Sequence, residues 1–457
     1  MKKVVNFKPN ITDTYLLAKK IIDLLKSRGY RAFLVGGSVR DMLMGIEPAE
    51  YDICTSARPD EISTLFENTV QVGANFGVVI VLIEGIKFEV ATFRREENYT
   101  DGRHPDEVIY SVDESEDVIR RDFTINGMLF DTDTNEIIDY VKGLKDLDSK
   151  VLQTIGDPEN KFREDRLRMM RAVRFASRFE FSIEEKTSRA IKKLSDAIIS
   201  VSPERIRDEI TYIISGKNPG NGLTMLSEYG LLKHILPEVE QMKGVEQPPE
   251  FHPEGDVFVH TCMVLDKLYE NTGGGVSSVL AFAGLLHDVG KPPTFTITDR
   301  IRFNGHDRVG AEMANRICRK LKLSNKQTDR IISLIREHLR FKDVTKMRES
   351  TLKRFMAMDH FDDHMELHLA DCQASHGMVT AYDFVREKQL EFTEEEIKPR
   401  PLIGGDDLIS LGYIPGPLFK EILNKVQEMQ LEGMIKNKED ALKYVSENFP
   451  ENHSKSL

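Results

Sequence analysis

The stretch LVGGSVRDMLMGIEPAEYDICTSA, residues 34–57, decides the fold of this chain. A hydrophobic strand ends in two glycines, Gly36 and Gly37. Because neither has a Cβ atom, backbone N–H groups there can approach a triphosphate. Arg40 follows, where its planar guanidinium can pair with phosphate oxygens. Glu50 and Asp52 would share one face of a strand, a geometry that can hold a pair of Mg²⁺ ions. Either feature alone would indicate an ordinary turn or strand, but together they predict metal-assisted phosphoryl transfer.

Composition indicates the number of domains and the class of protein. The 457 residues are 40% hydrophobic, enough for about three domains of roughly 150 residues each. No apolar run approaches the roughly 20 residues of a membrane span, and the N-terminus has no apolar leader core. Four cysteines without a CxxC pair disfavour a disulfide framework, so we expect a cytoplasmic protein with no membrane partner. A net charge of −12 argues against non-specific nucleic-acid binding by the whole surface, but it leaves room for a local basic groove.

Hydrophobic periodicity divides the chain into a mixed α/β part followed by helical parts. A helix is predicted over 12–28, and the alternating runs indicate strands at 31–37, 51–56, 78–85, 87–94 and 136–141. Beyond Asp157 the pattern is helical, apart from a segment broken by Gly and Pro. The predicted domains are a mixed α/β head (1–156), a helical neck (157–220), a linker (221–250), a histidine-rich helical domain (251–388) and a helical tail (389–457).

Three further motifs follow in order: RRDFTIN at 120–126, DYVKGLKDL at 139–147 and REDRLR at 163–168. With residues 34–57 they make the chain resemble class II tRNA nucleotidyltransferases and bacterial poly(A) polymerases, of the DNA polymerase β superfamily. The resemblance covers roughly residues 30–210. It implies an α+β fold, with a polymerase-β-like nucleotidyltransferase catalytic head followed by all-helical neck, HD and tail domains. The neck is then expected to carry an RNA-binding surface and the tail to contact tRNA. It also implies Mg²⁺ on Glu50 and Asp52, and nucleotide contacts from Gly37, Arg40, Arg121, Asp122, Asn126, Glu164, Asp165, Arg168, Arg171 and Arg174.

Glu50 stands where the family usually has Asp, although the archaeal branch has Glu at the corresponding place. Glu89, on the predicted strand 87–94, offers a third carboxylate, but a surface strand residue is the favoured interpretation. The motif DGRHP at 101–105 matches a loop that the family links to the switch from C to A addition.

Residues 161–174 carry a net charge of +4, and we expect them to form one helix from near Arg163. Asp165, Arg168, Arg171 and Arg174 recur every third residue, so neighbours in this row could touch. The resemblance implies that Asp165 and Arg168 read the Watson–Crick edge of CTP or ATP, that Glu164 orients the arginine, and that the other two arginines face phosphates. A carboxylate accepts from the exocyclic amine of both bases, and a guanidinium donates to their ring nitrogen. The alternative is a solvated charged face.

A second set of residues matches, in order, the signature of HD metal-dependent phosphohydrolases: His260, His287, Asp288, His306, His338 and Asp371. Any one of these histidines alone would be interpreted as structural. Together, imidazoles and carboxylates suit a transition metal such as Mn²⁺ or Ni²⁺, and an HD pair on a helix could let two metals share Asp288. The signature implies 2′,3′-cyclic phosphodiesterase or phosphatase activity on damaged tRNA ends. The remaining histidines at 252, 364, 368 and 376 are expected to be structural or exposed.

The motifs and the resemblance together predict template-independent addition of CCA to tRNA from CTP and ATP, and a second, phosphoesterase activity of the HD domain on RNA 3′ ends. An A-adding enzyme or a poly(A) polymerase uses the same chemistry and stays open. The alternative from another class is an RNA-binding protein with an inactive head and HD hydrolysis only. The sequence does not indicate the oligomeric state.

Overall fold

The computed structural model describes residues 2–72, 77–97, 107–250 and 252–450, so the motif at 101–105 lies outside the described residues. The chain forms two compact units. Unit 1 comprises Met1–Gln241 with Gly274–Ser278 and Ile317–Ser324, and unit 2 comprises the remainder. Within the described residues no helix has the length and apolar character needed to cross a membrane.

Unit 1 begins with a mixed eight-stranded sheet of order β1-β10-β9-β2-β3-β6-β5-β4. Its strands are β1 (Lys3–Asn6), β2 (Ala32–Val35), β3 (Asp52–Thr55), β4 (Thr69–Val72), β5 (Val78–Ile83), β6 (Ile86–Thr92), β9 (Met128–Asp131) and β10 (Glu136–Asp139). Neighbours are antiparallel except β3 and β6, which run parallel. β7 (Arg94–Glu97) and β8 (Glu107–Tyr110) form a separate ladder. The predicted strands are confirmed at β2, β3, β5, β6 and β10, whereas the periodicity missed the other five of these ten. It also missed the short parallel pair β11 (Val151–Leu152) and β12 (Ser182–Ile183).

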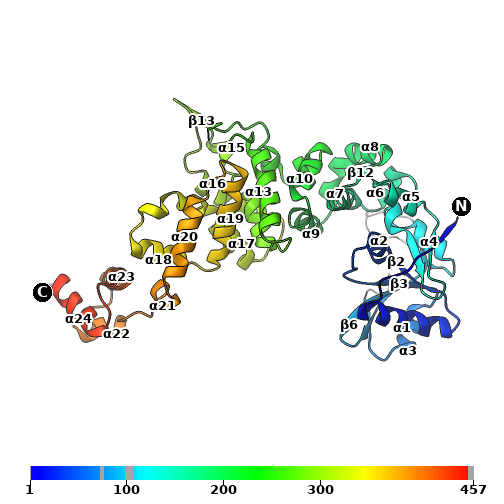
Figure 1. Ribbon diagram of the computed structural model, residues 1–457, viewed down its shortest axis with the longest axis horizontal. Helices are drawn as coiled ribbons and strands as arrows, with labels where there is room; N and C mark the ends of the chain where they lie inside the picture. The colour runs from blue at the N-terminus through cyan, green and yellow to red at the C-terminus, as the bar shows by residue number, and fades with distance from the viewer. Residues whose placement is uncertain (1, 73–76, 98–106, 251, 451–457) are drawn as a thin grey trace. The chain divides into compact units, whose positions relative to one another are not determined.

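Alternation along the strands gives the sheet two packed faces. In β2, Ala32 and Leu34 join the core under α1 (Asp13–Ser27), while Phe33 and Val35 join a second core on the other face. α1 is the helix predicted from residue 12, whose side chain caps it, and α3 (Pro59–Leu65) packs into the same core (Figure 1). The same alternation places Asp52 on the face away from α1, because its neighbour Ile53 belongs to the core under α1.

The DYVKGLKDL motif is built into a tight support for the 3₁₀ turn η1 (Thr124–Asn126). Asp139 Oδ1 accepts from the backbone N of Val141 at 2.9 Å and of Gly143 at 3.0 Å, at the start of α5 (Gly143–Asp148). A Cβ at Gly143 would lie 2.3 Å from the carbonyl oxygen of Thr124, so only glycine fits there. Asp146 accepts a 2.7 Å hydrogen bond from the Thr124 hydroxyl. These residues therefore hold η1 in place rather than reaching a substrate.

The neck differs from expectation at its start. The single helix predicted from near Arg163 is wrong: α6 (Pro158–Glu164) ends before Asp165, whose φ of −145° and ψ of 107° are extended, and α7 (Arg168–Phe179) follows. The rest of unit 1 contains α8 (Glu185–Leu194), η2 (Ser195–Ser200), α9 (Pro203–Ile214), α10 (Pro219–Glu228), α11 (Leu232–Ile235) and α12 (Pro237–Glu240). Half of the expected linker is thus helical, and the boundary between the units falls after Gln241.

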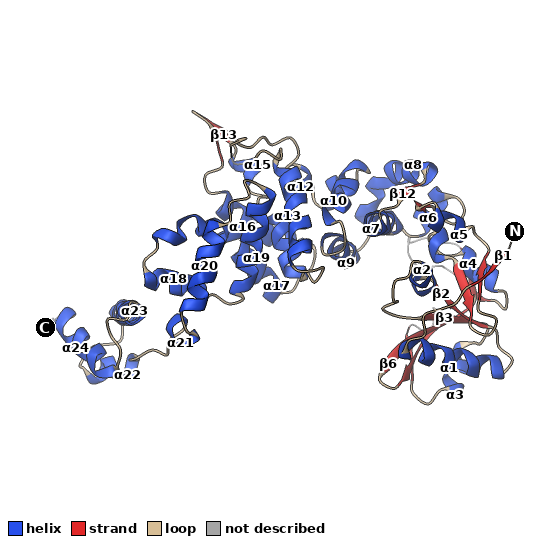
Figure 2. Cartoon of the chain, viewed as in Figure 1, coloured by secondary structure: helices blue, strands red, loops and turns tan. Residues whose placement is uncertain are grey.

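Unit 2 is helical, with one short hairpin that the sequence did not predict, β13 (Thr296–Ile297) with β14 (Ile301–Arg302) (Figure 2). Its helices are α13 (Val257–Asn271), α14 (Ser278–Leu286), α15 (Lys291–Thr294), α16 (His306–Lys320), α17 (Asn325–Glu337), η3 (His338–Lys346), α18 (Glu349–Met356), α19 (Phe361–Ala374), α20 (Thr380–Glu391), α21 (Glu394–Ile397), α22 (Gly405–Ser410), α23 (Pro417–Leu431) and α24 (Lys438–Asn448). The helices from α22 onward have a core of their own around Leu408 and Ile422.

Replacing Asp139 by Ala should destabilise the head. The side chain is 2% exposed, and its loss leaves three backbone N–H groups without their acceptor. We expect the free energy of unfolding to fall by about 3 kcal/mol, measured by urea denaturation. Asp148→Ala, which removes an exposed carboxylate from the end of the same helix, is the matched control. Equal stability of the two variants would contradict the support role of the motif.

Candidate functional site

The glycine turn after β2 brings opposite charges together. Gly36 has a φ of +77°, which favours glycine, and an added Cβ would lie 3.3 Å from both Arg121 Nη1 and Asp52 Oδ2. Gly37 opens α2 (Gly37–Leu43), and a Cβ there would lie 3.3 Å from Arg40 Nη2. The turn is therefore closely surrounded by Arg40, Asp52 and Arg121, which the sequence analysis expected to bind phosphate or metal.

The carboxylates of the head gather at the start of β3. Asp52 is its first residue, while Glu50 lies exposed in a bend before the strand rather than on it as expected. The parallel register that pairs Ile53 with Val90 sets Glu89 of β6 beside Asp52. Burial raises the pKa of Asp52 to about 6; Arg121 opposes this shift, and the negative charges of Glu50 and Glu89 add to it. Such crowded carboxylates fit a divalent cation, which would relieve their repulsion.

Arg40 is almost fully buried, at 4% exposure. Its Nε donates to Asp41 Oδ1 at 2.8 Å, and its Nη1 donates to Asn126 Oδ1 at 2.6 Å. The guanidinium also lies over the rings of Phe175 and Phe179 of α7, at 5.2 and 4.7 Å from their centroids. These contacts tie α2, η1 and α7 together, and the role of Arg40 toward phosphate stays a prediction.

A chain of buried polar groups continues from Asn126 into the neck. Asn126 Nδ2 donates to Asp122 Oδ1 at 3.1 Å, and Arg171 donates to Asp122 Oδ2 through Nε at 2.9 Å and Nη2 at 2.6 Å. Burial opposes ionisation of Asp122, but Arg171 keeps its pKa below the usual value. Arg174 Nη1 lies 3.3 Å from Glu209 Oε1 of α9, a residue that the sequence did not single out. Arg171 and Arg174 thus face protein carboxylates here.

The expected base-reading residues meet at the break between α6 and α7. Glu164 ends α6 and forms an ion pair with Arg168, the first residue of α7, so the contact that the resemblance implied is present. Arg168 Nη2 also donates to the carbonyl oxygen of Arg120 at 3.2 Å. Asp165 Oδ2 accepts from Arg205 Nη2 of α9 at 2.7 Å. The sequence missed Arg205, because no local pattern connects it with Asp165.

In unit 2 the structure brings all six HD residues together. Their ligand atoms form two groups, each within 4.8 Å: one of His260, His287 and Asp371, the other of Asp288, His306 and His338. His260 comes from α13 and Asp371 from α19, while His306 and His338 begin α16 and η3. The HD pair lies in the turn just after α14, not within a helix as expected.

The histidines are oriented by hydrogen bonds on their Nδ1 atoms. His287, His306 and His338 place Nδ1 at 2.8, 2.8 and 2.6 Å from the carbonyl oxygens three residues earlier. An Nδ1–H that donates leaves a lone pair on Nε2. The Nε2 atoms of His287 and His260 are 3.4 Å apart, and those of His306 and His338 are 3.3 Å apart. Nitrogens that face each other so closely can share a metal ion or a proton, and their number and orientation fit metal ligands.

Asp288 lies between the two groups. Its Oδ2 is 3.2 Å from His287 Nε2, and its Oδ1 is 3.4 Å from His306 Nε2, the arrangement expected of a ligand shared by two metals. Lys291 Nζ approaches Oδ2 at 2.6 Å. The two ligand groups open into a pocket of about 680 Å³. Its lining includes Lys291 and three further basic side chains, Arg300, Arg302 and Lys342. Groups that could hold metal ions, beside a basic pocket, would suit an anionic phosphoester.

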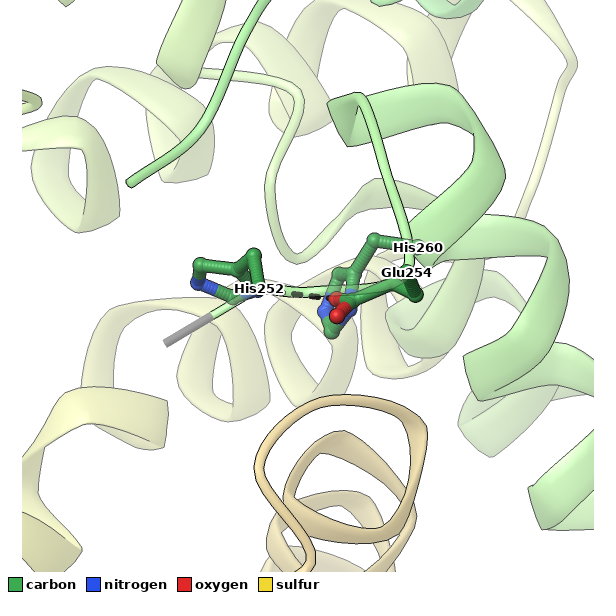
Figure 3. A group of neighbouring side chains, drawn as sticks. All are labelled: His252, Glu254 and His260. Atoms are coloured by element: carbon green, nitrogen blue, oxygen red, sulfur yellow. Dashed lines mark hydrogen bonds and ion pairs between the residues drawn. The ribbon is translucent and has the colours of Figure 1, made fainter. Parts of the chain in front are cut away.

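Glu254, next to this cluster, was not singled out in the sequence, whereas His252 was expected to be structural or exposed and is partly buried. Glu254 Oε1 lies 2.6 Å from His260 Nδ1 and 2.9 Å from His252 Nδ1 (Figure 3). The structural role expected of His368 agrees with its burial and with its stacking on Phe341 at 4.1 Å. His364 is buried as well, and His376 is exposed at the pocket wall.

Three family models match successive parts of the chain: the poly A polymerase head domain at residues 32–153, the probable RNA and SrmB-binding site of polymerase A at 180–243, and the HD domain at 257–363. The CCA-adding enzyme of Enterococcus faecalis is 31% identical over 441 residues, which cover 94% of this chain and 95% of that enzyme. The chain belongs to the CCA-adding enzyme family.

Other comparisons agree with this CCA-adding enzyme assignment. The enzyme of Ligilactobacillus salivarius is 43% identical over 225 residues, which span only 49% of this chain and 55% of that enzyme. The crystal structure of the Bacillus stearothermophilus CCA-adding enzyme in complex with CTP matches with a TM-score of 0.74 and 26% identity, covering 96% of this chain and 98% of that one. The expected nucleotidyltransferase head and helical HD domain are thereby confirmed.

Proposed function

We propose that the head adds CCA to the 3′ end of tRNA from CTP and ATP, without a nucleic-acid template. The observation that carries this proposal is the grouping of Asp52, Glu50 and Arg121 at the Gly36 turn, in a chain related to CCA-adding enzymes over most of its length. The named relatives favour CCA addition over the A-adding and poly(A) alternatives. The clustered carboxylates weigh against an inactive head.

Different residues of the head and neck would have different roles in nucleotide addition. Glu50 and Asp52 would hold two Mg²⁺ ions, which when bound activate the 3′-hydroxyl of the RNA and neutralise charge on the leaving pyrophosphate. Arg121, beside Asp52, would face the triphosphate at the glycine turn. Asp165 and Arg168, fixed by Arg205 and Glu164, would read the edge of the incoming base.

Asp52→Ala should abolish nucleotide addition, because the remaining carboxylates cannot hold both ions against their repulsion. Glu50→Asp, the usual family residue, should keep or raise activity. The assay offers CTP or ATP with tRNA lacking CCA, tRNA ending in CC, and an unrelated RNA oligomer. Asp60→Ala, which removes an exposed carboxylate on α3, is the control. Undiminished incorporation by Asp52→Ala would refute the assignment, and equal use of the unrelated oligomer would favour a poly(A) polymerase.

Arg168→Ala should relax base choice as well as slow the reaction. A lost base contact costs on the order of 1–3 kcal/mol, or roughly 5- to 150-fold in discrimination against UTP and GTP. Relative kcat/KM values for the four nucleotides measure this change. Arg163→Ala removes an exposed arginine from the same segment and should leave selectivity unchanged. If Arg168→Ala weakens all four nucleotides equally, the residue binds phosphate instead.

For unit 2 we propose hydrolysis of phosphoesters at RNA 3′ ends, including 2′,3′-cyclic phosphates, with a transition metal such as Mn²⁺ or Ni²⁺. The two ligand groups sharing Asp288 and the basic pocket beside them support this proposal. Metal ions bound there would supply a nucleophilic hydroxide and polarise the phosphate. The division into independent head and HD domains belongs to the same proposal.

His287→Ala should remove phosphoesterase activity on 2′,3′-cyclic nucleotides and leave nucleotide addition nearly intact, because it takes away one metal ligand in unit 2 and touches neither Glu50 nor Asp52. Both activities are measured on the full chain, with Mn²⁺ and again with Ni²⁺. His360→Asn is the control: the residue is exposed and has a φ of 56°, which Asn tolerates. A wild-type protein inactive on these substrates with every divalent metal would refute the HD proposal. Loss of nucleotide addition in folded His287→Ala would refute independence.

A further inference from the structure

We propose that Glu254 is a positioning residue that makes the two metal positions of the HD cluster unequal and that also orients His252 in the pocket beside them. One oxygen of this carboxylate contacts two imidazoles with different duties: His260 belongs to a ligand group, and His252 lines the pocket. The metal part of the proposal stands on this geometry, whereas the substrate part rests on the phosphoesterase function proposed above.

The contacts of Glu254 are short and enclosed. Its side chain is 5% exposed, and that of His260 is fully buried. Oε1 lies 2.6 Å from His260 Nδ1 and 2.9 Å from His252 Nδ1, and the two rings meet edge to face with centroids 4.9 Å apart (Figure 3). A buried carboxylate is costly unless it is hydrogen-bonded, and the two N–H donors on Oε1 offset part of that cost. Oε2 is buried as well and accepts no hydrogen bond from the residues that the structure describes.

His252, Glu254 and His260 also lie close enough together to hold a metal ion, but hydrogen bonds explain their short contacts better. With ligand bonds of about 2.0–2.1 Å, atoms only 2.6 Å apart would subtend roughly 80° at an ion, too narrow for a tetrahedral site. His260 would also have to bridge two ions, because its Nε2 already lies 3.1 Å from Asp371 Oδ1 in the other group. Glu254 therefore acts through His260 rather than as a ligand.

His260 is the HD histidine whose Nδ1 partner is a charged group. The other three use backbone carbonyls: those of Gly284, Phe303 and Ile335. A carboxylate partner makes an imidazole a stronger electron donor than a neutral carbonyl does. The position bounded by His260, His287 and Asp371 should therefore bind its metal more tightly than the one bounded by Asp288, His306 and His338.

His252 gives Glu254 its second role. The residue lines the same pocket as Asp288, Lys291 and Arg302. Because its Nδ1 is engaged by Glu254, its Nε2 is the polar atom that a phosphoester or ribose in the pocket can reach. Loss of Glu254 should therefore disturb both metal binding and substrate binding, whereas loss of His252 should disturb substrate binding alone.

The test uses the full chain carrying Asp52→Ala, so that the head does not compete for metal. Mn²⁺ is titrated and the free ion is followed by electron paramagnetic resonance. We expect two unequal Mn²⁺ sites, with the tighter one weakened 10- to 100-fold by Glu254→Ala. Glu254→Gln keeps an oxygen acceptor but loses the charge, and should weaken that site about tenfold. His252→Ala and the control Glu312→Gln, an exposed residue on α16, should leave both sites unchanged.

Hydrolysis of a 2′,3′-cyclic nucleotide at saturating Mn²⁺ gives the second readout. His252→Ala should raise KM severalfold with little change in kcat. Unchanged Mn²⁺ affinity in Glu254→Gln, which preserves the shape of the site, would overturn the proposal even if Glu254→Ala does not fold. Two equal sites in the parent protein would overturn it as well. Unequal sites that respond to Glu254, in a protein that hydrolyses no phosphoester, would support the metal part while refuting the proposed activity.

Discussion

Asp122 carries a negative charge inside unit 1, at 8% exposure, and the nucleotidyltransfer site depends on how that charge is compensated. Arg171 of α7 and Asn126 of η1 supply the hydrogen bonds. Leaving such a charge without its partner costs about 3–5 kcal/mol, so α7 is strongly held against η1. This contact fixes the position of Arg168, at the start of α7, relative to the Gly36 turn. The residues proposed to read the base and to bind metal can therefore keep one common geometry only while Asp122 stays paired.

The sequence predicted the motif at 163–168 but not the contacts that its side chains make. Spacing of three residues suggested that Asp165 stands in line with the arginines, yet its extended backbone removes it from any helix. Its partner is Arg205, and the acid opposite Arg174 is Glu209, both from α9. Periodicity predicts contacts between residues one helical turn apart. It does not predict a contact with a carboxylate or guanidinium on a helix further along the chain.

Prediction succeeded where a local pattern and a burial requirement coincide. The alternation in Ala32–Val35 identifies β2, because the sheet buries both of its faces there. The six HD residues could be found from their order alone, because the signature fixes that order, and the structure brings the six side chains together. Glu254 could not, because a carboxylate six residues before His260 becomes meaningful only when the start of α13 brings it to Nδ1. The β13–β14 hairpin is too short for alternation to appear.

The two sites also balance charge in opposite ways. In the head, burial and the neighbouring carboxylates raise the pKa of Asp52, so the protein leaves a repulsion that a hard cation such as Mg²⁺ can relieve. In the HD cluster, burial disfavours the charge on Asp371, but its hydrogen bond with His260 keeps the pKa of that carboxyl low, and Lys291 approaches Asp288. Imidazoles and a lysine there supply compensation before any metal does. The charge balance of the head therefore fits a hard cation, whereas the imidazole-rich HD cluster fits softer metals.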